Sequence, residues 1–384
     1  MAKRKNQMDL SEQYRMENSY RKNYKIAIIT NSSGGFFCFR EDLIKELIKR
    51  GNRILALTPF DGHEDDLKAL GVELTEVIMD RRGINPIHDI ALIKSYYVFL
   101  QKEKPDFVIT YTIKPNIYGG LSSRIAGISY ASNITGLGTA FEKPGVLRNF
   151  VTHMYKISLR QAKCVFFENS SDRDFFITEK IISIEQAVLL NGAGVNLDRF
   201  YYQPYPEEDR PFHFLYMGRV MKEKGVEELF TVMKRLKEEN YDCVLDVLGG
   251  FEEDYKNAID QYSKEGWLNY YGFQEDVRPF IAKCHCFVLP SYHEGMANTN
   301  LECAASGRAI VTSNIPGCRE AVVNEISGLL CEPRMTESLY VAMRKILFLS
   351  LEALQKMGIE GRKHMENNFD KCKVVEETIR YLNQ

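Results

Sequence analysis

The sequence has 384 residues, enough for about two to three domains. Its 45% hydrophobic and 27% charged residues are ordinary for a globular protein, and its net charge of -2 excludes a dedicated nucleic-acid binder and a disordered acidic chain. The charge is uneven, since residues 1–25 hold seven basic and three acidic residues, which leaves the rest mildly acidic.

Apolar, β-branched runs alternate with helical patterns through the first half, as in α/β folds. The expected strands are 25–30, 53–57, 73–77, 107–110, 130–134, 164–167 and 187–190, and the expected helices are 39–50, 88–103 and 117–126. The glycine-rich turn at 31–35 matches neither the dinucleotide fingerprint nor the P-loop. It is therefore either a plain tight turn or a place where the backbone approaches a ligand.

The alternation breaks at residues 191–211, where glycines, prolines and an acidic run favour an interdomain linker. A second series follows, with strands expected at 212–217, 243–248, 268–271, 286–290, 309–312 and 328–331, and helices at 226–239, 252–264, 298–306 and 337–350. The C-terminal end is helical and amphipathic. Two such halves predict one ligand cleft, facing the carboxyl ends of both sets of strands.

The nine cysteines are scattered and odd in number, which favours a reducing compartment. The only tight cluster, Cys284-His285-Cys286, lacks a second ligand pair, so buried strand cysteines are favoured over a metal site. The chain start lacks the apolar core of a signal peptide, and the longest uncharged stretch, 125–141, is too polar to span a membrane. We therefore expect a cytoplasmic protein.

The segment 290–307 is the most indicative of chemistry, because a strand leads through a loop into a helix that Asn298 or Thr299 can cap. Such a helix N-terminus presents N–H groups and a positive dipole end, which suits a phosphate. Glu294 in the loop and Glu302 in the helix can accept hydrogen bonds from sugar hydroxyls.

Two carboxylates beside a phosphate repel it unless cations offset them. Candidate cations lie in 218–225, after the first strand of the second half. Arg219 can hold two phosphate oxygens at once, and Lys224 acts as a point charge. The alternative is a surface loop in which both side chains are solvated.

The pattern Glu294-x7-Glu302 followed by Cys-Ala-Ala-Ser-Gly-Arg resembles the E-x7-E region of retaining GT-B glycosyltransferases of family 4. Five further motifs carry the resemblance: Gly194-Val195-Asn196, Gly218-Arg219 with Lys224-Gly225, Leu248-Gly249-Gly250, Tyr271-Gly272-Phe273 and 315–320. In the first half, 80–86, 111–120 and 135–141 look like the branch that builds bacterial capsule, O-antigen and related glycans on polyprenyl diphosphate. The resemblance covers residues 24–384.

This resemblance implies a GT-B fold, in which two Rossmann-like domains with parallel sheets face a central cleft. The implied organisation is a basic tail (1–23), an acceptor-binding domain (24–192), a linker (193–211), a nucleotide-sugar-binding domain (212–364) and a C-terminal helix that crosses back to the first domain (365–384). No cofactor or metal is expected, because the family needs none and no acidic D-x-D site stands out.

The resemblance also implies residue roles. Glu294 contacts the donor hexose, and Arg219 and Lys224 neutralise the leaving diphosphate, so these three form the expected catalytic set. Glu302 binds the ribose hydroxyls. The other expected donor-binding residues are Gly218, Gly249, Phe273, Gly295, Met296, Ala297, Asn298 and Thr299, of which Met296, Ala297 and Asn298 offer N–H groups to the diphosphate. The expected acceptor-side residues are Gly34, Gly35, Lys114, Asn116 and Thr135.

Two departures from the family pattern limit this transfer of roles. Many relatives place a histidine after the strand that ends here at Ile134, whereas this chain has Thr135, so no histidine role is carried over. Ala297 replaces a glycine, which narrows the space at the phosphate. His293 is either a catalytic base or a structural loop residue, and Lys114 either binds phosphate or acceptor or is solvated.

The predicted reaction is retaining transfer of a hexose or N-acetylhexosamine from a nucleotide sugar, with UDP expected, to a polyprenyl-diphosphate-linked or other glycan acceptor. The alternatives are a GT-B-fold UDP-sugar epimerase and a non-catalytic sugar-nucleotide-binding paralogue. Residues 143–163 mix bases and aromatics at helical spacing, which fits either a helix on the inner membrane surface or one packed on the sheet. The basic tail would add attraction to anionic lipid.

Overall fold

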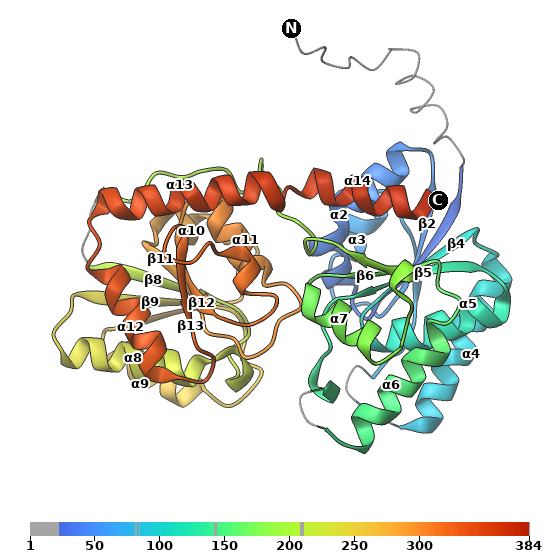
Figure 1. Ribbon diagram of the computed structural model, residues 1–384, viewed down its shortest axis with the longest axis horizontal. Coiled ribbons are helices and arrows are strands. Elements are labelled where there is room, and N and C mark those ends of the chain that lie inside the picture. The colour runs from blue at the N-terminus through green and yellow to red at the C-terminus, as the bar shows by residue number, and fades with distance from the viewer. Residues whose placement is uncertain (1–22, 81–82, 84, 142–143, 208–210, 384) are drawn as a thin grey trace, which may run out of the picture. The chain divides into compact units, whose positions relative to one another are not determined.

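The computed structural model describes residues 23–80, 83, 85–141, 144–207 and 211–383, and the predicted basic tail lies almost wholly outside them. The described chain forms two compact units (Figure 1). Unit 1 contains the residues up to Phe167, Arg173–Val188 and the chain from Val375 onward, and unit 2 contains Glu168–Asp172 and Leu189–Val374.

Unit 1 is a seven-stranded sheet in the order β3-β2-β1-β4-β5-β6-β7, parallel from β3 through β6. Its strands are β1 (Lys25–Ile29), β2 (Arg53–Thr58), β3 (Glu73–Glu76), β4 (Phe107–Tyr111), β5 (Ser129–Ile134), β6 (Cys164–Phe167) and β7 (Ala187–Leu189). Its helices are α2 (Ser33–Lys49), α3 (Glu64–Ala69), α4 (Pro86–Glu103), the π-helical η1 (Pro115–Gly119), α5 (Gly120–Ala126), η2 (Thr139–Phe141), α6 (Val146–Ser158) and η3 (Ile184–Gln186). The helix α7 (Ser170–Thr178) and the last helix α14 (Lys371–Asn383) each have residues in both units.

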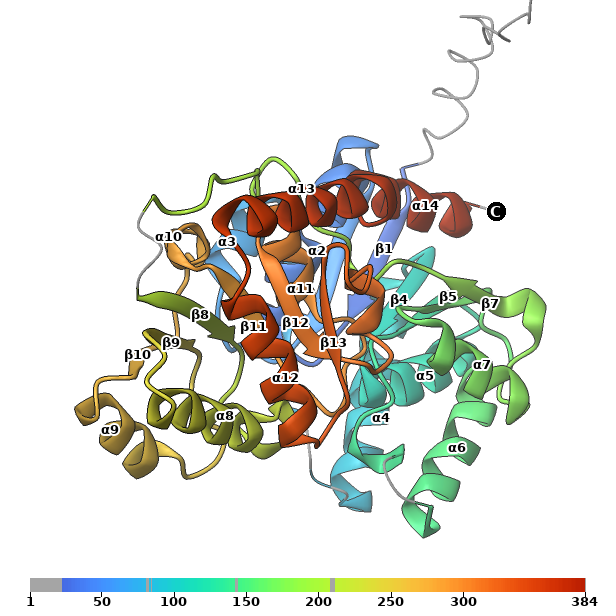
Figure 2. The ribbon, with the colours of Figure 1, turned by 60° about the vertical axis from the view of Figure 1, so that its left-hand side comes forward.

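Unit 2 is a six-stranded sheet in the order β10-β9-β8-β11-β12-β13, and every neighbouring pair is parallel (Figure 2). Its strands are β8 (Phe212–Met217), β9 (Cys243–Leu248), β10 (Leu268–Gly272), β11 (Cys286–Leu289), β12 (Ala309–Ser313) and β13 (Gly328–Cys331). Its helices are η4 (Lys222–Lys224), α8 (Val226–Glu238), α9 (Lys256–Lys264), α10 (Arg278–Lys283), α11 (Asn298–Ala305), η5 (Arg319–Ala321), α12 (Thr336–Leu347) and α13 (Leu351–Asn368).

The predicted Rossmann-like architecture is confirmed for both units, and each predicted strand ends within one residue of its expected position. The central strands are buried on both faces, which is why their sequences are continuous apolar runs. In both sheets the strand order reverses beside the first strand, between β1 and β4 and between β8 and β11. Ligands of open α/β sheets bind at the carboxyl ends of the strands at this switch point.

The start of α2 differs from the prediction, because the helix begins at Ser33 rather than near residue 39. Ser32 has extended backbone, and its Oγ accepts a hydrogen bond from the N–H of Gly35, which is the pattern of a helix N-cap. The short helices α3, α7 and α10 were not predicted. They are too short for a clear helical period in the sequence.

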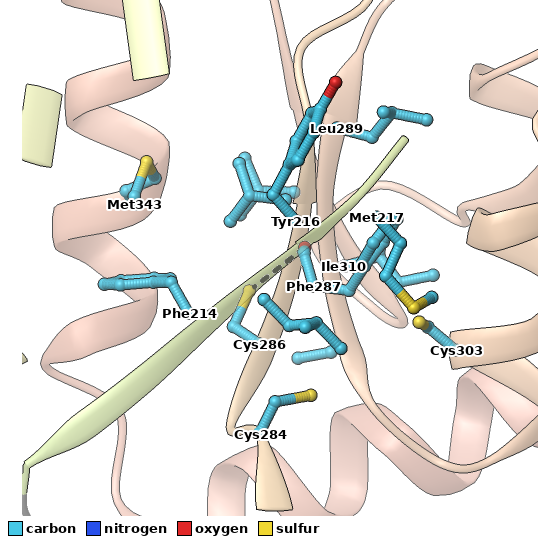
Figure 3. Packing of buried hydrophobic residues seen from close by; sticks show 14 of the residues in the cluster. Phe214, Tyr216, Met217, Cys284, Cys286, Phe287, Leu289, Cys303, Ile310 and Met343 are labelled. Atoms are coloured by element: carbon cyan, nitrogen blue, oxygen red, sulfur yellow. Dashed lines mark hydrogen bonds between the residues drawn. The ribbon is translucent and has the colours of Figure 1, made fainter. Parts of the chain in front are cut away.

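The core of unit 2 packs between its sheet and helices (Figure 3). Cys284 and Cys286 are fully buried in it near Phe214 and Phe287, so the predicted burial is confirmed. Only Cys286 lies in a strand, β11, whereas Cys284 follows α10. Burial raises the pKa of the Cys284 thiol to about 12. Within the described ranges, no three His, Cys, Asp or Glu side chains lie together as a metal site would require.

The residues that lead into β8 are fixed to unit 2 by Arg308. This side chain is fully buried, and its guanidinium lies 4.7 Å from the centre of the Tyr205 ring. It donates hydrogen bonds of 2.7–2.9 Å to four backbone carbonyl oxygens, those of Gln203, Pro204, Ile281 and Ala282.

None of the helices in the described part of the chain has the length and apolar character of a membrane span.

Candidate functional site

The candidate site lies at the switch point of unit 2, where the loops after β8 and β11 meet. Gly225 has φ of +71°, and a Cβ atom on it would lie only 2.1 Å from the Pro290 carbonyl oxygen. The N–H of Tyr292 donates to the Glu223 carbonyl oxygen at 2.9 Å. Only glycine allows this approach, so the Lys224-Gly225 motif holds the two loops together.

The same contact brings together Lys224 and Glu294, which are 70 positions apart in the sequence. The Lys224 Nζ lies 2.5 Å from the Glu294 Oε1, and the two side chains are only 17% and 14% exposed. The Ser291 hydroxyl donates to the same carboxylate oxygen at 2.9 Å. The pair therefore offers an ammonium for phosphate and a carboxylate for a sugar hydroxyl, and the interpretation of Lys224 as a solvated loop residue is wrong.

Arg219 follows β8 but is half exposed, and its Nη1 lies 3.5 Å from the Glu252 Oε2. Its backbone is fixed, because the buried Tyr216 hydroxyl donates to the Arg219 carbonyl oxygen at 2.7 Å. Burial raises the pKa of Tyr216, and the nearby Glu294 charge adds to that shift. The Arg219 guanidinium is thus accessible to an anion.

Gly218 and Gly249 bring the loops after β8 and β9 into backbone contact. Gly249 has φ of +135°, and a Cβ atom on it would lie 1.9 Å from the Gly218 carbonyl oxygen. Phe273 follows β10 and is 77% exposed, so its ring is free to contact a ligand.

In the loop before α11, the structure contradicts the role expected for the Ala297 N–H. The N–H of Ala297 already donates to the Gly317 carbonyl oxygen at 2.8 Å, so it is not available to a diphosphate. Helix α11 begins at Asn298 with Ala297 in the cap position, and no side chain caps it, so the predicted capping by Asn298 or Thr299 is wrong. An uncapped helix N-terminus keeps N–H groups that can donate hydrogen bonds to an anion.

Other residues of this loop differ in exposure. Met296 is buried, Gly295 and Thr299 are partly exposed, and His293 is exposed beside Glu294. The Asn298 Oδ1 is buried and has no hydrogen-bond partner within the described chain.

Glu302 lies in α11, four residues after Asn298. Burial raises the pKa of its carboxyl group to about 7, although Lys371 and Arg199 act in the opposite direction. A carboxyl group with a pKa near neutrality can accept a hydrogen bond from a hydroxyl when ionised and donate one when protonated.

The raised pKa of Glu302 predicts a pH dependence of stability. Between its ordinary pKa of 4.5 and about 7, the folded protein binds more protons than the unfolded chain, so this group makes the folded state less stable as pH rises. We expect Glu302→Gln to lose less of its melting temperature than the wild type between pH 5.5 and pH 7.5. Asp172, whose pKa burial raises to about 6, acts in both proteins and cancels in the comparison. Parallel pH profiles of the two proteins would contradict the prediction.

The acceptor-side glycines of unit 1 are not in a loop. Gly34 and Gly35 lie in the first turn of α2, and their N–H groups donate to the Asp61 Oδ1 at 3.1 Å and to the Ser32 Oγ at 2.9 Å. The Asp61 carboxylate therefore accepts a hydrogen bond at the helix N-terminus, and the two glycines lie in a helix rather than in the expected loop. Their place on the acceptor side stays a prediction.

The other acceptor-side residues lie after β4 and β5. The Lys114 Nζ lies 2.8 Å from the Asp89 Oδ1, and the side chains are only 15% and 16% exposed, so the solvated interpretation of Lys114 is wrong. Asn116 is buried, its amide oxygen accepts a hydrogen bond from the Thr110 hydroxyl, and its Nδ2 donates to the Asn133 carbonyl oxygen, so both polar groups of the amide have partners within unit 1. Thr135 is partly exposed at the end of β5.

Sequence reasoning missed two residues around these sites. The Tyr292 hydroxyl donates to the Glu228 carboxylate at 2.6 Å, and Arg334 lies over the ring at 4.6 Å, which fixes the loop that carries Glu294. Thr112 follows β4 with φ of +73°, a strained conformation for a β-branched residue. Position next to a motif is a signal for Tyr292, whereas nothing in the sequence reveals the backbone of Thr112.

The fold consists of two Rossmann-like units, and unit 2 places a Lys–Glu pair and an uncapped helix N-terminus at its switch point. The family profile of "Glycosyl transferases group 1" matches residues 199–364, and that of "Glycosyl transferase 4-like" matches residues 25–169. The chain belongs to this family of GT-B glycosyltransferases and is an enzyme of the glycosyl-transferring class.

Two of the similar proteins are named for bacterial glycan assembly. The chain is 27% identical over 336 residues, 82% of this chain and 87% of the relative, to the N,N'-diacetylbacillosaminyl-diphospho-undecaprenol alpha-1,3-N-acetylgalactosaminyltransferase of Campylobacter jejuni. It is 25% identical over 373 residues, 93% and 96% of the two chains, to the capsular polysaccharide biosynthesis glycosyltransferase CapM of Staphylococcus aureus. The Anabaena protein Alr3699/HepE, solved with UDP and glucose, shares the fold with a TM-score of 0.77, 14% identity and coverage of 94% and 100%.

Proposed function

We propose that the protein transfers a hexose or N-acetylhexosamine from a UDP-sugar to a polyprenyl-diphosphate-linked glycan, with retention of anomeric configuration and without a metal ion. The observation that carries the proposal is the Lys224–Glu294 pair beside the uncapped N-terminus of α11. In the proposed complex Glu294 accepts a hydrogen bond from the donor hexose, and Glu302 contacts the ribose.

The proposed chemistry depends on the leaving group. Negative charge develops on the diphosphate as the glycosidic bond breaks, and Lys224, Arg219 and the N–H groups of α11 stabilise it. The departing phosphate oxygen assists removal of the acceptor proton, so that no covalent sugar–enzyme intermediate forms. These cations supply the positive charge that a bound metal would otherwise give.

The acceptor class is supported by the relatives. The Campylobacter jejuni protein is named for an undecaprenol-diphosphate acceptor and an N-acetylgalactosamine donor, and the chain covers 87% of it. We therefore place N-acetylgalactosamine first among donor sugars, followed by N-acetylglucosamine and galactose. A lipid-linked acceptor lies at a membrane surface, and we propose that the reaction takes place at its cytoplasmic face.

A nucleotide-sugar panel tests the proposal. A ligand that binds the folded state raises the melting temperature, so the donor is identified by thermal shift and then incubated with a short-chain polyprenyl-diphosphate glycan. We expect transfer that persists in EDTA and a product whose anomer, read by NMR, matches that of the donor. An inverted product contradicts retention, loss of transfer in EDTA contradicts metal independence, and donor turnover without acceptor favours the epimerase.

A membrane contact is proposed at α6. This helix buries Val151 and Tyr155 in unit 1 but leaves Val146 87% and Phe150 56% exposed. It has no acidic residue, and Arg148 lies between the exposed apolar residues. An apolar end with basic neighbours suits the surface of an anionic bilayer.

Vesicle flotation tests this contact. We expect the wild type to float with anionic vesicles and far less with neutral ones. Phe150→Glu is expected to weaken binding to anionic vesicles by about tenfold or more, because the aromatic ring that inserts into the lipid in the proposed contact is lost. Ile184→Glu, at another exposed apolar position of unit 1, is the matched control. Equal, negligible binding to both vesicle types would refute the contact.

A further inference from the structure

The loop that carries Glu294 is fixed from two sides within unit 2. On one side, Gly317 has φ of +83°, and a Cβ atom on it would come within 2.5 Å of the Glu294 carbonyl oxygen. The Ala297 N–H donates to the Gly317 carbonyl oxygen from the same side. The loop backbone therefore has little freedom to move toward η5.

On the other side lies Asn169, which is 1% exposed and belongs to the segment Glu168–Asp172 of the same unit. Its Nδ2 donates to the Gly295 carbonyl oxygen at 2.9 Å and to the Asp172 Oδ2 at 3.1 Å. Its Oδ1 accepts the Asp172 N–H at 2.9 Å, which is the N-cap pattern of α7. Because the oxygen faces an N–H group, the amide has one orientation, and its NH₂ group must face Gly295.

The surroundings of this amide are acidic. Glu168 and Asp172 are 5% and 8% exposed, and Glu320 adds a further negative charge near Asp172. The NH₂ group of Asn169 thus lies between two acceptors, the buried Asp172 carboxyl group and the Gly295 carbonyl oxygen, and donates a hydrogen bond to each. A carboxylate at position 169 would face both acceptors and repel them.

We propose that Asn169 is a positioning residue for sugar transfer, whose amide N–H fixes the Gly295 carbonyl and so places the adjacent Glu294 carboxylate against the donor hexose. The inference rests on the proposed function, in which Glu294 contacts the hexose while Glu302 contacts the ribose. Loss of this hydrogen bond therefore affects transfer of the sugar more than affinity for the free nucleotide.

The test uses two variants that keep an N-cap oxygen for α7 but lose the N–H donor to Gly295, Asn169→Ser and Asn169→Asp. We expect kcat/KM for the UDP-sugar to fall about tenfold in the serine variant and further in the aspartate variant, because small displacements of a reacting group are costly. UDP affinity, measured by calorimetry, is expected to stay within about twofold of the wild type. The control is Asn52→Asp, whose amide bonds the backbone of Tyr24 and Leu47 in unit 1.

The outcomes separate the two levels of inference. Wild-type kinetics in both Asn169 variants would overturn the positioning role while leaving the proposed function intact. An equal loss of UDP affinity and of kcat/KM would also overturn it, because a general disturbance of the loop would then be the cause. A wild-type protein that neither binds UDP nor transfers sugar would overturn the proposed function and this inference together.

Discussion

Lys224→Met is expected to lower kcat for sugar transfer by about 100- to 1,000-fold, which is the usual effect of removing one preorganised group that stabilises transition-state charge. The ammonium lies 2.5 Å from the Glu294 carboxylate in a site that is mostly shielded from water. Its loss removes the positive charge that faces the leaving diphosphate and leaves Glu294 without its cation. Because the charge on the diphosphate grows in the transition state, kcat is expected to fall more than affinity for the donor.

The matched control is Lys222→Met in the same helical turn. Lys222 is 61% exposed and pairs with Glu227 rather than with Glu294. We expect it to keep transfer within about twofold of the wild type, since solvated pairs contribute little. Steady-state kinetics with the donor from the thermal-shift panel decide the outcome, and equal activities of the two variants would refute the role of Lys224.

Arg308→Met is expected to be the most destabilising single change in unit 2. The substitution leaves four backbone carbonyl oxygens, of which that of Ile281 is buried and the others are partly buried, without their donor, and a methionine cannot replace any of these bonds. We expect a loss of about 3–5 kcal/mol, as found when one partner of a buried charged contact is removed. For a unit of this size the melting temperature falls by roughly 10 °C.

Arg308→Lys keeps the charge but not the planar fork of donors, so an intermediate loss is expected. Arg380→Met, at a side chain that is 58% exposed and pairs with Glu377, controls for removal of an arginine from the surface. Thermal unfolding followed by circular dichroism measures all three. If Arg308→Met melts with the wild type, the backbone contacts of Arg308 do not stabilise unit 2.

The strands were predictable because a parallel strand covered on both faces must be apolar along its whole length, as β11 is, or along nearly all of it, as in β8 with its one histidine. The first residues of the helices were harder to predict than the strands. Two glycines disfavour a helix, yet Ser32 and the distant Asp61 together satisfy the N–H groups of the first turn of α2. A cap that comes from another segment leaves no local pattern.

Some features of the candidate site were also predictable from the sequence, and others were not. The motif around Glu294 and Glu302 and the cations after β8 were visible, because loop, helix start and spacing are local features. The contacts that these residues make were not visible in the sequence. Lys224 pairs with Glu294, whereas the Ala297 N–H donates to the Gly317 carbonyl oxygen. The buried partners of the Asn116 amide were not visible either, because a position after a strand gives no sign of them.

The sequence by itself determined two βα series and the residue types at the site, since periodicity, turn residues and motif spacing are properties of neighbouring positions. The class of enzyme came from the family resemblance that these motifs carry. Only the tertiary structure decided which N–H groups and charges are already used, as Asp61 uses Gly34 and as Asn169 binds Gly295. These partners lie 27 and 126 positions apart. A polar group's partner is set by what the packed chain brings within about 3 Å, and that distance is not encoded locally.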